Sequence, residues 1–112
     1  MKYLICMQRT LNGITTTYYL TKINDINTYE LLNRARNTNS KYPLEEARSL
    51  IPIAKKIMRK NTRSNYKLAK RFNEHHYTNY STKWNIFLLR ESKLDSYLNK
   101  LKDLRQKELN NQ

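Results

Sequence analysis

The Asn12-Gly13 pair constrains the fold of this chain more than any other feature. Gly13 is the only glycine among 112 residues. A two-residue type I′ turn needs positive φ at both central positions, which Asn and Gly tolerate best. The pair separates two segments rich in β-branched and aromatic residues, Lys2 to Gln8 and Ile14 to Ile23. The sequence therefore predicts an antiparallel β-hairpin near its beginning.

The first predicted strand carries apolar side chains on both faces. Alternation places Tyr3, Ile5 and Met7 on one face. Leu4 and Cys6 lie on the other face. This pattern is typical of a strand that is covered at least in part on both sides.

A third strand is predicted from Lys83 to Glu91, because apolar residues again occupy both alternating faces. One face carries Trp84, Ile86 and Leu88, and the other carries Phe87 and Leu89.

Apolar residues at helical spacing predict a central helix. Pro43 suits a first turn, and Glu45 and Glu46 suit the positive end of the helix dipole. Pro52 falls inside the helix and cannot donate to the carbonyl four residues back, so we expect a kink or two abutting helices. The apolar stripe keeps its register across Pro52, which favours the kink. The stripe consists of Leu44, Ala47, Leu50, Ile51, Ala54, Ile57 and Met58.

Three further helical segments are predicted. Tyr29 to Ala35 suggests a short helix, and Tyr66 to Phe72 a second short helical face beyond Asn61. Ser92 precedes an amphipathic C-terminal helix that reaches about Leu109. Its apolar stripe is Leu94, Leu98, Leu101 and Leu104.

Together these elements predict an α+β fold in one small basic domain spanning residues 1–112. We expect the hairpin and the Trp84 strand to form an antiparallel sheet. The kinked central helix and the C-terminal helix are expected to pack against one face of that sheet.

The central helix is strongly basic. No acidic residue occurs between Glu46 and Glu74, in a chain whose formal net charge is +13. Folded proteins usually mix both signs, because self-repulsion destabilises a compact state. Unrelieved positive charge therefore favours an external polyanion, with nucleic-acid phosphate as the first candidate. The predicted binding residues of this tract are Arg48, Lys55, Lys56, Arg59, Lys60, Arg63, Lys67, Lys70 and Arg71.

The alternative for this tract is a solvated helix face in a protein from an AT-rich genome, where lysine and asparagine usage is raised. The missing acids are harder to explain in that way than the surplus of lysines.

From the second half of the basic tract onward, aromatic residues are interleaved with cations. The rings are Tyr66, Phe72, Tyr77, Tyr80 and Trp84, and the cations are Lys67, Lys70, Arg71 and Lys83. Exposed rings beside cations can stack on unpaired bases. Phe72 and Trp84 are better explained as core residues. Tyr77 and Tyr80, in a segment without a clear period, are predicted as the exposed pair that contacts a partner.

No catalytic or metal site is predicted. His75 and His76 are adjacent and so diverge on any regular element, and no Cys, Asp or third His stands at ligand spacing. A ribonuclease acid-base pair stays open in principle. One glycine cannot build a phosphate-cradling loop, so we expect no cofactor and no enzyme activity. Cys6 is expected to be a small core residue.

The chain is expected to be a cytoplasmic protein of a bacterial host cell, without contact with a membrane. The apolar run from Tyr3 to Met7 is too short for a membrane span. The single cysteine fits a reducing compartment.

The layout resembles that of small orphan proteins from phages and mobile elements of AT-rich Firmicutes. The matching pieces are the strand Lys2 to Met7, the Asn12-Gly13 hairpin, the helix start from Tyr42 to Ala47 and the late Trp84 strand. Anti-CRISPR inhibitors recur among such proteins, so the resemblance implies a non-enzymatic inhibitor of an RNA-guided nuclease. Many such inhibitors are acidic DNA mimics. A basic inhibitor should instead engage guide RNA, target DNA or an acidic face of the effector.

Three functions are therefore expected in order. The first is inhibition of a host RNA-guided defence nuclease, a type II CRISPR effector being the specific case. The second is direct DNA or RNA binding as an accessory or regulatory protein of the element. The third is a small basic RNA-cleaving toxin. A homodimer through the C-terminal leucine stripe is an open alternative for the oligomeric state.

Overall fold

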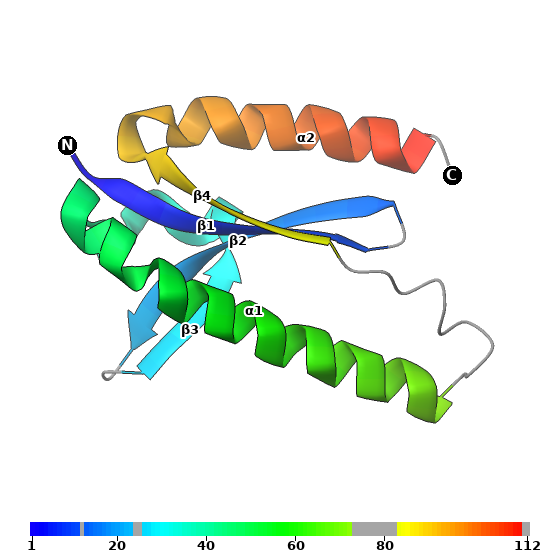
Figure 1. Cartoon of the computed structure of the whole chain (residues 1–112). Helices are drawn as coiled ribbons and strands as arrows, with labels where there is room; N and C mark the ends of the chain where they lie inside the picture. The colour runs from blue at the N-terminus through cyan, green and yellow to red at the C-terminus, as the bar shows by residue number, and fades with distance from the viewer. Residues whose placement is uncertain (12, 24–25, 73–82, 111–112) are drawn as a thin grey trace.

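The computed structural model describes residues 1–11, 13–23, 26–72 and 83–110, apart from the side chains of residues 11, 23, 62–72 and 83 (Figure 1). It confirms the α+β class, with four strands in one antiparallel sheet instead of the expected three. The elements are β1 (Tyr3–Leu11), β2 (Ile14–Ile23), β3 (Ile26–Leu31), the 3-10 helix η1 (Leu32–Asn37), α1 (Leu44–Phe72), β4 (Lys83–Arg90), the 3-10 turn η3 (Glu91–Lys93) and α2 (Leu94–Asn110).

The predicted hairpin is confirmed and lies at the centre of the sheet. The strand order is β3-β2-β1-β4, so β1 and β2 are the two inner strands. Leu11 faces Ile14 at the end of the hairpin, and Gly13 has a φ of 77°. A side chain rarely adopts that backbone conformation, which explains the glycine at this position. Asn12 lies outside the described residues.

The expected helix from Tyr29 to Ala35 is wrong. Its first half is the edge strand β3, which pairs with β2, and its second half is η1. Local spacing suggested a helix, but the backbone hydrogen bonds of this segment are supplied by β2, which a local pattern does not reveal. Leu32 and Ala35 of η1 are buried. Residues three apart share one face of a 3-10 helix, which accounts for the apparent helical spacing of these two positions.

The two long helices cover opposite faces of the sheet, and the expectation that both lie on one face is wrong. In Figure 1, α1 crosses one face and α2 the other. The core beneath α1 contains Ile5, Met7, Leu20, Ala47 and Ala54. The core beneath α2 contains Leu4, Cys6, Tyr19, Leu32, Ala35, Leu89, Leu94 and Leu98. The physical reason is the alternation of apolar side chains along β1, which gives each face of the sheet a core to bury.

Helix α1 is one continuous helix. It passes through Pro52 and Asn61 and ends at Phe72, so Tyr66 to Phe72 belongs to α1 and is not a separate helix. The kink at Pro52 stays a prediction. The later turns of α1 extend past the edge of the sheet (Figure 1).

Cys6 is a fully buried core residue, as expected. Burial raises the pKa of its thiol to about 12. The reactive thiolate is therefore disfavoured at neutral pH, and Cys6 acts as a small apolar side chain.

Candidate nucleic-acid interface

The described half of the basic tract forms an exposed face of α1. Positions on a helix turn by about 100° per residue, so the side chains that follow Ala47 and Ala54 diverge from the buried stripe. Ala47 and Ala54 are completely buried against the sheet. All five cations of this region are exposed; we call them the α1 basic face, and they are Arg48, Lys55, Lys56, Arg59 and Lys60.

None of these five cations has an acidic partner among the described residues. The two ion pairs in that part of the chain join Arg36 to Asp95 (Nε to Oδ1, 3.2 Å) and Lys41 to Glu91 (Nζ to Oε2, 3.4 Å). Helix α2 shows the usual arrangement, because three acids are interspersed among its four bases. Its charged residues are Asp95, Lys100, Lys102, Asp103, Arg105, Lys107 and Glu108. Positive charge is therefore concentrated on α1 while the acids of α2 lie across the sheet.

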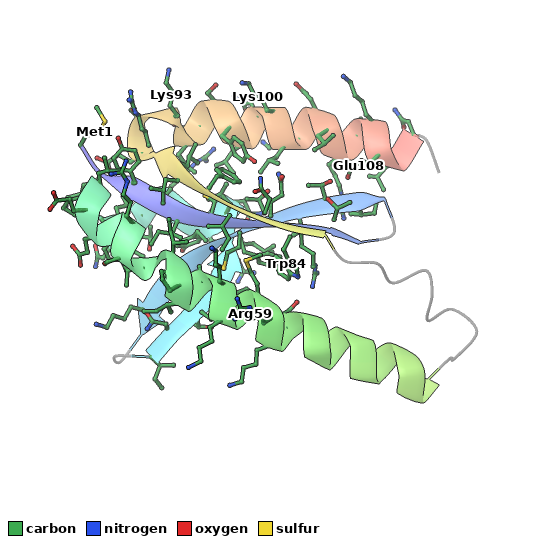
Figure 2. All side chains as sticks on the ribbon, viewed as in Figure 1. Met1, Arg59, Trp84, Lys93, Lys100 and Glu108 are labelled. Atoms are coloured by element: carbon green, nitrogen blue, oxygen red, sulfur yellow. The ribbon has the colours of Figure 1, made fainter. Side chains whose placement is uncertain are left out.

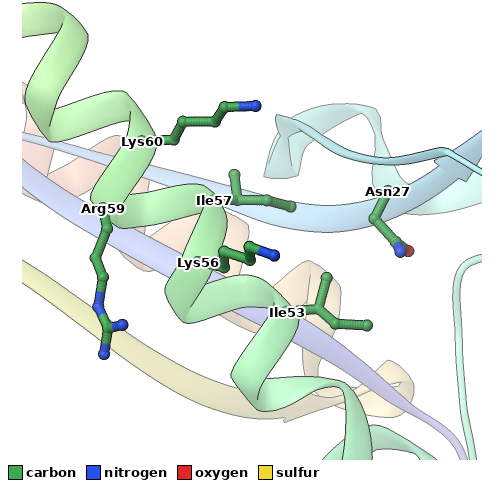
Figure 3. A pocket seen from close by; sticks show the side chains of 6 residues that line it. All are labelled: Asn27, Ile53, Lys56, Ile57, Arg59 and Lys60. Carbon is green, nitrogen blue, oxygen red and sulfur yellow. The ribbon is translucent and has the colours of Figure 1, made fainter.

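A groove of about 620 Å³ lies between α1 and the edge strand β3. Ile53 and Ile57 supply apolar surface, and Lys56 and Lys60 extend toward the side of the groove on which Asn27 lies (Figure 3). Arg59 also lines the groove but points to the other side of the helix. The groove thus has two ammonium groups on one wall and an amide on the other.

An arginine and three aromatic rings stand next to this groove, beneath α1. The Arg9 guanidinium carbon lies 5.4 Å from the Tyr18 ring centroid and 5.7 Å from that of Trp84. Tyr18 meets Tyr29 edge to face, with ring centroids 5.1 Å apart. Arg9 also donates to the Tyr18 hydroxyl (2.9 Å). Cation–π contacts and hydrogen bonds therefore hold this guanidinium in one place.

Asn61 joins this cluster to α1 through both ends of its amide. Its Oδ1 accepts from Arg9 (3.2 Å), and its Nδ2 donates to the Tyr29 hydroxyl (2.6 Å). These two bonds attach α1 to β1 and β3 one residue after Lys60, so they set where the basic face stands relative to the sheet.

Replacing Asn61 with alanine is expected to lower the free energy of unfolding by about 1–2 kcal/mol, because Arg9 and Tyr29 each lose a partner and one of them is charged. Urea denaturation followed by circular dichroism measures this. Asn61→Asp is the matched control. It still accepts from Arg9 and can accept from the Tyr29 hydroxyl, so its loss should be smaller. Equal losses would show that the two bonds do not account for the stability.

Sequence reasoning missed Arg9, Tyr18, Tyr29 and Asn61. The sequence did contain one signal, which is Arg9 itself. This residue shares with Met7 the face of β1 that α1 covers. A cation at an apolar position of a strand needs polar or aromatic partners. The sequence alone does not show which residues, distant along the chain, supply these contacts.

The remaining predicted site residues divide into two groups. The backbone of α1 includes Arg63, Lys67, Lys70 and Arg71, and their side chains lie outside the described part. The segment with Tyr77, Tyr80, His75 and His76 lies entirely outside it. Trp84 is half-buried and packs on the core beneath α1, in agreement with its assignment to the core.

Among the described residues, no three His, Cys, Asp or Glu side chains gather in a group that could hold a metal ion. Within those same ranges, no helix combines the length and the apolar character needed to cross a membrane.

Comparison with protein-family models, with curated proteins and with solved structures finds no match to this chain.

Proposed function

We propose that this protein binds nucleic acid by neutralising backbone phosphates with the α1 basic face. The observation that carries the proposal is five exposed cations on one helix, none of them in an ion pair with a described acid. Each phosphate that such a cation neutralises releases condensed counterions, and the gains accumulate along a rigid row of charges. A helix packed on a sheet provides that rigid row.

The groove between α1 and β3 provides a path for the nucleic-acid backbone. Lys56 and Lys60 reach into the space opposite Asn27, where a phosphate can be held between ammonium groups and an amide donor (Figure 3). Arg59 extends the positive surface over the other side of the helix. These contacts address phosphate and sugar, so they favour binding with little sequence preference.

Salt dependence tests this proposal. Labelled duplex DNA, single-stranded DNA and duplex RNA are titrated with the protein at about 0.05 to 0.3 M salt, and fluorescence anisotropy is measured. Five phosphate contacts predict that log K falls against log salt with a slope of about −4 or steeper on DNA duplex, because each contact contributes about 0.9. A slope near zero would contradict phosphate binding.

Inhibition of an RNA-guided nuclease is the biological role that we propose for this surface. Its support is the layout of the chain together with a basic face that can engage guide RNA or target DNA. The alternative role is regulation of the element through its own DNA or RNA. A cleavage assay with a type II effector, its guide and a target separates them, since full cleavage at saturating protein excludes inhibition. The third alternative, an RNA-cleaving toxin, depends on His75 and His76, which lie outside the described residues.

A further inference from the structure

A second groove lies on the face of the sheet opposite α1. Its volume is about 780 Å³, and α2, β2 and η1 line it. This volume falls within the range of known ligand pockets. Because the sheet separates it from the α1 basic face, the groove is independent of the function proposed above.

The charged side chains of this groove are all positive. Arg36 enters it from η1, and Lys102 and Arg105 enter from α2. Arg36 pairs with Asp95 through its Nε, while Lys102 and Arg105 form no ion pair with any residue that the structure describes. The Oε2 of Glu108, on the same helix, accepts from the Thr15 backbone N–H (3.0 Å). The groove therefore offers free positive charge to an anionic ligand.

The remainder of the lining is aliphatic and hydroxylic. Leu31 and Leu101 expose apolar surface beside the cations, and Thr16 offers a hydroxyl. No aromatic ring is found among the described residues that line the groove. Bases of single-stranded nucleic acid bind by stacking on such rings, so this lining suits aliphatic side chains better than bases.

We propose that this groove binds an acidic, amphipathic segment of a partner protein. Apolar side chains of the segment contact Leu31 and Leu101, and its carboxylates pair with Lys102 and Arg105. Arg105 can hold a carboxylate through two parallel N–H bonds. Charge complementarity and an apolar floor together define the occupant, as in grooves that accept a peptide helix. The protein then carries nucleic acid on one face and an acidic protein segment on the other.

The test uses a synthetic fluorescein-labelled peptide with glutamates on one side of a helix and leucines at i, i+4 and i+7. We expect the wild-type protein to bind it, and the Lys102→Glu, Arg105→Glu variant to bind at least about tenfold more weakly, since two attractions become repulsions. The matched control is Lys100→Glu with Lys107→Glu. These residues lie on the same helix outside the groove, and Lys100 points away from the sheet (Figure 2). This control should retain nearly full affinity.

A second peptide, with serine in place of each leucine, should bind at least about tenfold more weakly if the leucine floor takes part. The proposal would be overturned if the first peptide did not bind, or if the two protein variants lost the same peptide affinity. It would also be overturned if only charge reversal on α1 lowered the peptide affinity, or if the protein associated with itself instead of binding the peptide. Loss of single-stranded DNA binding in the groove variant alone would assign the groove to nucleic acid. If circular dichroism shows that the glutamate variant is unfolded, Lys102→Gln with Arg105→Gln replaces it, with an expected loss of peptide affinity of about threefold or more.

Discussion

Replacing Lys56, Arg59 and Lys60 with glutamate is expected to lower the affinity for DNA by about 10² to 10³-fold at about 0.1 M salt. Counterion release supplies about 0.9 logarithmic units per phosphate contact for each tenfold reduction in salt below 1 M, so three contacts are worth close to three units. The three side chains line the groove between α1 and β3, along which the nucleic-acid backbone is proposed to run. Anisotropy titrations measure the affinity, and the salt slope should fall by about three.

The control for this variant is Lys93, Lys100 and Lys107 changed together to glutamate. These three residues are exposed near or on α2, across the sheet from α1, and the change in net charge is the same. Long-range repulsion should cost this control less than about tenfold in affinity, because salt screens charges that are farther apart than about 10 Å at 0.1 M. Equal losses in the two variants would mean that net charge, and not the α1 basic face, determines binding.

Elements with local signals were predictable from the sequence. Gly13 marks the hairpin turn, because the backbone there needs a positive φ. Pro43 and the two glutamates after it mark the beginning of α1 at Leu44. The exposed cations of α1 were also predictable, since a helix that buries one stripe leaves its other side in solvent.

Features that depend on contacts between separate segments were not predictable. The apolar spacing after Thr28 suggested a helix, and it is the pairing with β2 that makes Ile26–Leu31 a strand. For the same reason, the sequence did not reveal that Asn27 lines the groove between α1 and β3. It also did not reveal that Asn61 is the partner of Arg9 and Tyr29. Each of these residues obtains its role from a neighbour that is more than twenty positions away along the chain.

The prediction that both long helices lie on one face of the sheet was wrong for a different reason. Here the sequence did contain the decisive signal. Tyr3, Ile5 and Met7 alternate with Leu4 and Cys6, so β1 has two apolar faces. Each face must be removed from water, and one helix layer can cover only one of them. The two faces of β1 therefore already required a layer on each side of the sheet.

Alanine at Leu4 and alanine at Ile5, made separately, should each lower the free energy of unfolding by about 2–5 kcal/mol. The two residues are neighbours on β1 and are both completely buried, Leu4 in the core beneath α2 and Ile5 in the core beneath α1. Adjacent strand residues point to opposite faces, so both substitutions are severe only if both faces are covered. Urea denaturation followed by tryptophan fluorescence of Trp84 gives both values.

Ile26→Ala is the matched control for Ile5→Ala, because it removes the same atoms from a strand at a position that is 67% exposed. Its cost should stay below about 1 kcal/mol, since little apolar surface returns to water. If either Leu4→Ala or Ile5→Ala were as mild as this control, the corresponding face of β1 would be open to solvent. The helix over that face would then not be a layer of the fold. The surface on that helix, which is the α1 basic face or the groove lined by α2, β2 and η1, would lose its rigid support.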